Sequence, residues 1–133
     1  MRIGKHLRAD NDNKVLLHWI PAIIMMAVIF IASSTPSTRI PNFGLADFVI
    51  KKSGHAIGYG LLGLAFWYGM KFDRVRVWHA WVLAVFYATS DEFHQSFVPG
   101  RHAWWVDVAI DSFSAALVLT FTAWWRRRKN RSG

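Results

Sequence analysis

Two adjacent carboxylates, a histidine and a glutamine interrupt an otherwise apolar stretch at SDEFHQSFVPGR, residues 90–101. On a helix, Asp91, His94 and Gln95 share one face because they are three and four residues apart, whereas Glu92 is rotated by about 100° from Asp91. Neighbouring carboxyl groups in a low-dielectric site can divide the roles of acid and base between them. The stretch is therefore a candidate for acid–base chemistry, with Asp91 or Glu92 as the base.

Two further polar sets have helical spacing. Lys51 or Lys52 precedes His55 and Tyr59 by three or four residues at each step, and Asp107 precedes Asp111 by one turn. A lysine and an arginine such as Lys52 and Arg101 can hold a phosphate or a carboxylate. We therefore take Asp91, Glu92, His55 and Asp107 as catalytic candidates and Lys52, Tyr59, His94, Gln95, Arg101 and Asp111 as substrate-binding candidates.

Apolar segments that could position these groups cover most of the 133 residues, of which 53% are hydrophobic. A helix that crosses a bilayer needs about 20 residues. Four segments come close to this length, namely residues 15–33, 55–70, 77–97 and 103–125. The third segment has only 13 residues before Ser90, so the polar stretch must complete its crossing. We predict a single all-α domain over residues 1–133, an antiparallel four-helix membrane bundle with short loops.

The connection between the first two segments, residues 34–54, contains helix-breaking Pro36, Pro41, Asn42 and Gly44. The sequence that follows, FGLADFVIKKSG, could form a short amphipathic helix in the membrane interface. We expect such an interfacial helix between the first and second spans, at a depth that the sequence does not define.

The charges are segregated along the chain. Twelve of the sixteen Lys and Arg residues fall on one side if the N-terminus is inside, and cationic loops stay cytoplasmic. We therefore predict a multi-pass inner-membrane protein with both termini cytoplasmic. A net charge of +8 could indicate a nucleic-acid partner in a soluble protein, but here it reflects cations such as Arg126, Arg127 and Arg128 after the last span. We predict membrane lipid, and no nucleic acid, as the partner.

In this topology the start of the second span, the end of the third and the start of the fourth meet at the outer leaflet. Buried charges there must pair, bind a metal or stay neutral, because transfer of an unpaired ion into low dielectric costs several kcal/mol. His55, His94, Asp91 and Asp107 include metal ligands, but none has a spacing such as His-Glu-x-x-His. We predict no metal site, and the sequence names no cofactor.

The chain resembles the VanZ-like family of bacterial membrane proteins, named after a protein linked to teicoplanin resistance. KSGHAIGYGLLG is similar to its Lys-x-x-His-x-x-x-Tyr stretch, and SDEFHQSFVPGRHAWWVDVAID to its Asp-Glu-x-x-Gln-x-x-x-x-x-Arg segment followed by Asp and Asn. The preceding SSTP is like its Ser-x-Pro. Asp111 departs from the motif, because it stands where the family usually has Asn. Eight positions match the motifs one by one: Lys52, His55, Tyr59, Asp91, Glu92, Gln95, Arg101 and Asp107. The resemblance implies a function at the cell envelope, with antibiotic resistance as its founding association.

Several functions remain open for this polar set. Asp91, Glu92, Arg101 and Lys52 could form a structural ion-pair network that fixes the register of three helices. The set could instead modify a lipid-linked cell-wall intermediate or a lipid head group, or bind a glycopeptide, a lipid or a partner protein without turnover. Proton- or ion-coupled transport needs more room than four short spans offer unless a homo-oligomer forms. Whether the protein is an enzyme is not decided by its sequence.

Overall fold

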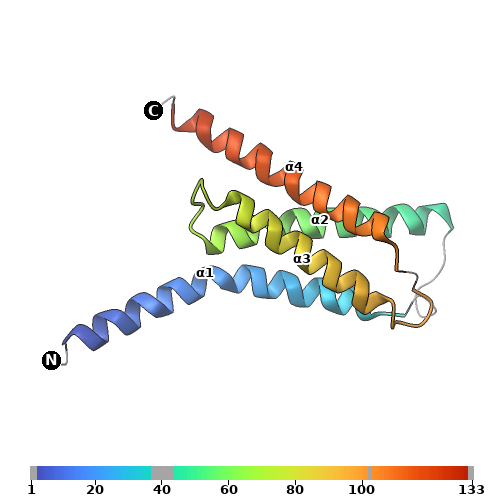
Figure 1. Cartoon of the computed structure of the whole chain (residues 1–133), viewed down its shortest axis with the longest axis horizontal. Coiled ribbons are helices and arrows are strands. Elements are labelled where there is room, and N and C mark those ends of the chain that lie inside the picture. The colour runs from blue at the N-terminus through green and yellow to red at the C-terminus, as the bar shows by residue number, and fades with distance from the viewer. Residues whose placement is uncertain (1–2, 37–43, 102, 132–133) are drawn as a thin grey trace.

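The computed structural model describes residues 3–36, 44–101 and 103–131. Within these ranges the chain is all-helical, without strands. The helices are α1 (Ile3–Ser34), α2 (Leu45–Gly69), α3 (Val77–Gln95) and α4 (Trp105–Lys129). Successive helices run in opposite directions, so the ends of α1 and α3 lie at the same end of the bundle as the start of α4 (Figure 1). The predicted all-α four-helix bundle is confirmed.

One expectation about the first connection needs correction. The expected interfacial helix is not separate, because α2 is continuous from Leu45 to Gly69 and includes all but the last residue of the segment predicted as the second span. Ser53 and Gly54 lower helix propensity, but neither removes a backbone donor, so the helix continues through them. Of the predicted helix-breaking residues, Pro41 and Asn42 lie outside the described residues. The consequence is that Lys52 and His55 lie inside a helix and not at its first turn.

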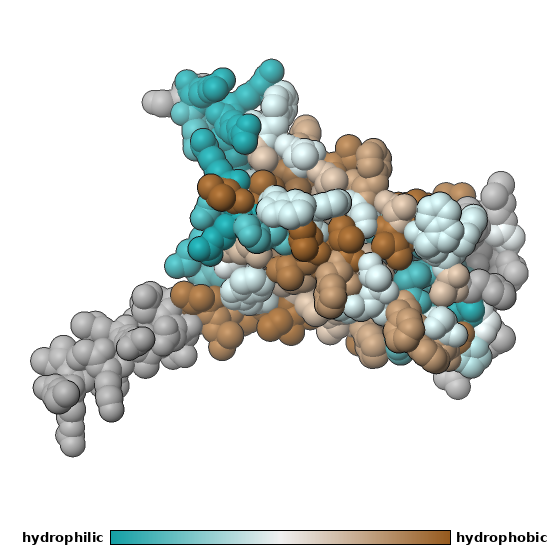
Figure 2. Space-filling model, viewed as in Figure 1, coloured by the Kyte–Doolittle hydropathy of each residue, from teal (hydrophilic) through white to brown (hydrophobic). Residues whose placement is uncertain are grey.

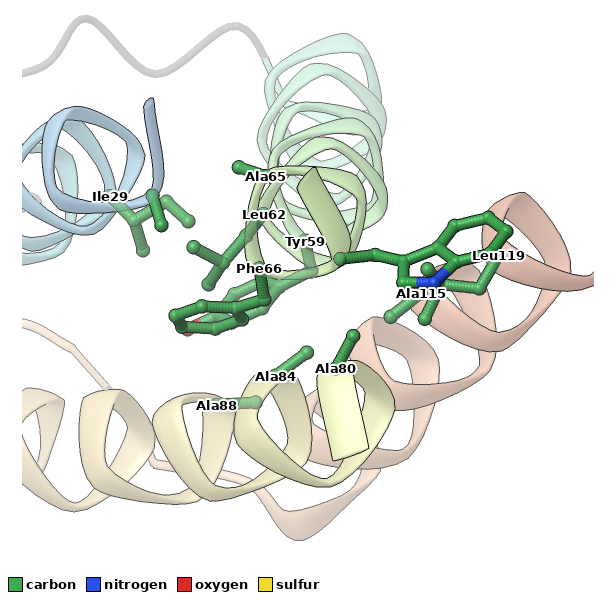
Figure 3. Close-up of a cluster of buried hydrophobic side chains, with 12 residues drawn as sticks. Ile29, Tyr59, Leu62, Ala65, Phe66, Ala80, Ala84, Ala88, Ala115 and Leu119 are labelled. Atoms are coloured by element: carbon green, nitrogen blue, oxygen red, sulfur yellow. The ribbon is translucent and has the colours of Figure 1, made fainter. Parts of the chain in front are cut away.

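The core is centred on α2, whose Tyr59, Leu62, Phe66 and Trp67 are almost fully buried. Figure 3 shows alanines of α3 pointing toward these side chains, and Ala115 and Leu119 of α4 lying beside them. The α3 alanines at positions 80, 84 and 88 recur every four residues and form one stripe. Such small side chains let two helix backbones approach closely, as is common where helices pack in membranes.

The outer surface of the bundle is strongly apolar. Phe86, Phe93 and Phe113 are each more than 60% exposed, whereas Asp91 and Asp111 are each 4% exposed. Figure 2 shows hydrophobic side chains over the middle of the bundle and hydrophilic ones at the end that holds the α4 C-terminus. This distribution inverts that of a soluble protein, in which large exposed apolar patches are rare. The surface is therefore suited to contact with lipid.

By length and composition, two helices of the described chain could cross a membrane. These are the part of α1 from Val15 to Ser34 and α4. Polar residues such as Lys52 in α2, and Asp91 with Glu92 in α3, lower the hydropathy of the other two helices. Both of these helices turn such residues inward, where the polar groups contact neighbouring helices instead of lipid.

Candidate functional site

Polar side chains from all four helices meet at one end of the bundle. We call this group the polar layer and define it as the ten candidate residues together with Ser33 and Ser34. It lies where α1 and α3 end and α4 begins (Figure 1). Its members in α2 are Lys52, His55 and Tyr59. Its members are brought together because short antiparallel connections return the chain to the same level of the bundle.

Asp91 accepts two side-chain hydrogen bonds within the polar layer. Its Oδ2 accepts a hydrogen bond from Ser33 Oγ of α1 at 2.7 Å and another from Gln95 Nε2, one turn along α3, at 3.0 Å. Its second oxygen, Oδ1, is buried and has no hydrogen-bond partner in the described chain. Asp91 therefore ties α3 to α1 through one oxygen and leaves the other available to a ligand or a water molecule.

Arg101 closes this end of the bundle from the loop after α3. It donates to Gln95 Oε1 at 3.4 Å, to the carbonyl oxygen of Ala32 at 2.8 Å and to that of Thr35 at 3.3 Å. The last two contacts add donors to carbonyls at the C-terminus of α1, where the Ala32 oxygen otherwise accepts only a long bond of 3.4 Å from the Thr35 N–H. The first contact orients the Gln95 amide, so that its nitrogen faces Asp91. A chain of donors thus runs from Arg101 through Gln95 to Asp91.

His94 makes a second contact between α3 and α1. Its Nε2 lies 3.0 Å from Ser34 Oγ, and its ring lies against Phe30 with centroids 4.7 Å apart. Asp91, His94 and Gln95 therefore all face α1, which is the shared face expected from their spacing. Glu92, rotated away from them, faces α4 instead, where its Oε1 accepts a hydrogen bond from the backbone N–H of Trp104. Glu92 thereby satisfies one of the free donors at the start of α4.

Two pairs link α2 to α4. Lys52 forms an ion pair with Asp107 and lies over the Trp104 ring, with its nitrogen 5.9 Å from the ring centroid. One turn further along α2, His55 Nδ1 lies 3.6 Å from Asp111 Oδ2. The one-turn spacings of both helices therefore match each other, and each basic group of α2 meets one carboxylate of α4.

Tyr59 lies at the centre of the polar layer. It is 1% exposed, and its ring stacks on that of His55 with centroids 6.2 Å apart. Its hydroxyl group interacts with the Asp91 carboxylate and is within electrostatic reach of Asp111, although the contact with Asp91 falls outside normal hydrogen-bond geometry. Tyr59 thus joins the Asp91 group to the pairs between α2 and α4.

A family model described as VanZ/LLP1 matches residues 17–126. The chain belongs to the VanZ/LLP1 family. It is accordingly a VanZ-like membrane protein. None of the curated proteins and none of the solved structures matches it.

All ten candidate residues of this VanZ/LLP1 chain lie within the matched segment and within the polar layer. The ionic contacts differ from the ion-pair network considered from the sequence, because Lys52 pairs with Asp107 and Arg101 contacts an amide and two carbonyls. In the described chain, no three His, Asp or Glu side chains converge as metal ligands.

Sequence reasoning missed the two serines that α1 contributes. Ser33 is fully buried against Asp91 and Gln95, and Ser34 contacts His94. Their signal was present, because SSTP ends the first apolar segment at the level where the other polar residues meet. A serine is nevertheless common at the end of a helix, so its type alone does not separate a site residue from a terminus.

A groove of about 360 Å³ adjoins the polar layer between α1 and α2. Met25, Val28, Ile29 and Ala32 of α1 line one wall, and α2 lines the other. Lys51, His55 and Arg101 also line it. This VanZ-like bundle therefore combines an apolar groove with basic side chains at the level of its polar layer.

Proposed function

We propose that this VanZ-like protein acts at the bacterial cell envelope by binding the anionic head group of a lipid-linked molecule in its polar layer. It spans the inner membrane four times with both termini in the cytoplasm, so that the polar layer lies in the outer leaflet. The resistance to glycopeptides associated with the family fits this function, since such antibiotics act on lipid-linked cell-wall intermediates outside that membrane.

The proposal rests on two buried polar atoms that form no hydrogen bond of normal geometry in the described chain. Buried polar groups are almost always hydrogen-bonded, because an unpaired one costs about 1–3 kcal/mol. Asp91 Oδ1 and Tyr59 Oη are both buried without a partner in the described chain, in a layer that otherwise pairs its groups closely. Tyr59 Oη and the Asp91 carboxylate lie close enough to interact with each other, but their contact is not a hydrogen bond of normal geometry. A ligand hydroxyl group between α1, α2 and α3 would donate to Asp91 Oδ1 and accept from Tyr59 Oη.

The basic groups around these atoms suit an anionic head group. Arg101 is exposed enough to meet a ligand and is held in place by carbonyls of α1. Its guanidinium group can bind two phosphate oxygens at once. Lys52 adds positive charge and His55 adds a ring nitrogen on the α2 side, although each already contacts a carboxylate. A phosphate would therefore bind near Arg101, with a neighbouring hydroxyl group of the ligand at Asp91 and Tyr59.

Acid–base chemistry on the bound head group is a second candidate function. Asp91 and Glu92 are adjacent, and each is buried with a different set of hydrogen-bond donors. Such different environments can assign the roles of base and acid to two carboxyl groups. Incubation of the purified protein with phosphatidylglycerol distinguishes the two functions: binding alone returns the lipid unchanged, whereas chemistry yields a new lipid species by mass spectrometry.

The proposal is tested by two tyrosine variants in a strain that lacks the protein. Tyr59→Phe removes an unpartnered hydroxyl group, whereas Tyr87→Phe removes one that donates to the Met26 carbonyl oxygen at 2.6 Å. If the polar layer binds a ligand, Tyr59→Phe loses resistance to envelope antibiotics while its thermal stability is unchanged or raised. Tyr87→Phe, the matched control, should lower the thermal stability, because it removes the hydrogen bond to Met26. Full resistance with both Tyr59→Phe and Asp91→Asn, at wild-type abundance, would refute the proposal.

A further inference from the structure

The groove between α1 and α2 has a defined direction relative to the polar layer. Its α1 wall runs from Met25 to Thr35, a rise of about 15 Å along the helix. Met25 lies near the middle of the bundle, and Thr35 lies at the end where Arg101 binds its carbonyl oxygen. The groove is therefore apolar at its deep end and basic at the end that opens on the polar layer.

Two glycines of α2 keep this groove open. Gly54 and Gly58 both line it, and a methyl group added to Gly54 would meet no atom within 4 Å. A methyl group added to Gly58 would only touch Ile29, at 3.7 Å. The helices therefore do not approach each other to fill the space that the missing side chains leave. By contrast, a methyl group on Gly60, which faces α4, would meet Val118 at 2.9 Å.

We propose that this groove holds one hydrocarbon chain of a phosphate-bearing lipid whose head group lies at Arg101 and His55. The assignment rests on the proposed function and extends it by naming the ligand class: an anionic amphiphile with at least one long chain. The apolar wall matches a hydrocarbon chain, and the basic end matches a phosphate. Val28 and Ile50 beside the groove are 54% and 68% exposed, so a lipid could enter sideways from the bilayer.

Photo-crosslinking tests the assignment in nanodiscs of phosphatidylcholine. The probe is phosphatidylglycerol with a diazirine on one acyl chain, close to the head group in one version and at the chain end in another. We expect the first version to label α1 around Ala32 and Thr35 and the second to label it around Met25 and Val28. The zwitterionic phosphatidylcholine probe should label the same positions several-fold less.

A variant that fills the groove provides the control for specificity. Gly54→Leu adds a Cβ that meets no atom within 4 Å, and the rest of the side chain would extend into the groove. The fold should therefore be retained, as helical circular dichroism and the thermal midpoint would show. Exclusion of two methylene groups from the groove would weaken labelling by about tenfold. Ser53→Leu is the matched control, because the neighbouring Ser53 is exposed and lies outside the groove. It should label like the wild type.

Three results would overturn the assignment. These are equal labelling of Gly54→Leu and Ser53→Leu, equal labelling by the two lipid probes, and a reversed order of the two diazirine positions along α1. Absence of groove labelling in the wild type would mean that another occupant, such as a second copy of the chain, fills it. If groove labelling fails but Tyr59→Phe still loses function at normal stability, this inference falls and the proposed function stands. If labelling succeeds but Tyr59→Phe and Asp91→Asn are fully active, the proposed function falls instead.

Discussion

Replacement of Ser33 by alanine measures what the polar layer contributes to the fold. The variant removes the hydroxyl group that donates to Asp91 Oδ2 at 2.7 Å from a position with no solvent exposure. A hydrogen bond to a charged group contributes about 1.5–3 kcal/mol and a neutral one about 0.5–1.5 kcal/mol. Hydrogen bonds between helices in membranes lie at the lower end, about 0.6 kcal/mol on average. Because this bond is short and fully buried, we expect a loss of about 1–2 kcal/mol in the free energy of unfolding.

Reversible unfolding in mixed micelles gives this free energy directly. The matched control is Ser90→Ala, which makes the same chemical change on an exposed residue whose hydroxyl group bonds only to its own helix at Phe86. Ser90→Ala should change the free energy of unfolding by no more than about 0.5 kcal/mol. A double-mutant cycle that adds Asp91→Asn isolates the pair. If Ser33→Ala and Ser90→Ala cost the same, the contact between α1 and α3 does not stabilise the bundle and the reasoning fails.

Three further predictions concern packing, capping and topology. Gly60→Ala should destabilise the bundle by roughly 1 kcal/mol, because its methyl group meets Val118 at 2.9 Å. Gly54→Ala should instead stabilise the bundle by about 0.5–1 kcal/mol. Thermal unfolding of both variants tests these opposite signs. Glu92→Ala should lower the free energy of unfolding by about 0.5–2 kcal/mol and speed amide exchange at the start of α4, because the Trp104 N–H loses its acceptor. Glu92→Gln should keep most of the stability. Equal amide exchange in the two variants would contradict this prediction. A reporter fused to the C-terminus should be active only in the cytoplasm, and an external signal would reverse the proposed orientation.

Helical periodicity and segment length were sufficient to predict the bundle and much of the polar layer. The spacing of Asp91, His94 and Gln95 placed them on one face, and that face meets α1 in the structure. The matching one-turn spacing of Lys52 with His55 and of Asp107 with Asp111 likewise becomes two contacts between α2 and α4. These predictions depend on geometry within one helix, which sequence encodes directly.

Contacts between helices were not predictable in the same way. Which carboxylate pairs with Lys52, and whether Arg101 meets a carboxylate or a carbonyl, depends on the relative rotation and height of two helices. Neither quantity follows from the pattern of one segment. The groove was hidden for the same reason: the structure leaves space at Gly54 but brings α4 close at Gly60, and the type of residue is the same at both positions.

The alanine stripe of α3 has a mechanical consequence. A row of methyl groups at Ala80, Ala84 and Ala88 sets how close α3 comes to its neighbours, but it presents few ridges that would resist sliding along the helix axis. The axial position of α3 must then be fixed by directional contacts: Trp81 Nε1 with the Ser112 carbonyl oxygen near one end, Tyr87 Oη with the Met26 carbonyl oxygen in the middle, and Asp91 with Ser33 at the other end. At that end His94 with Ser34 and Glu92 with the Trp104 N–H act beside Asp91 with Ser33. The polar layer therefore fixes the axial position of α3 through three contacts, and a ligand that displaced one of them would leave the helix held by the other two.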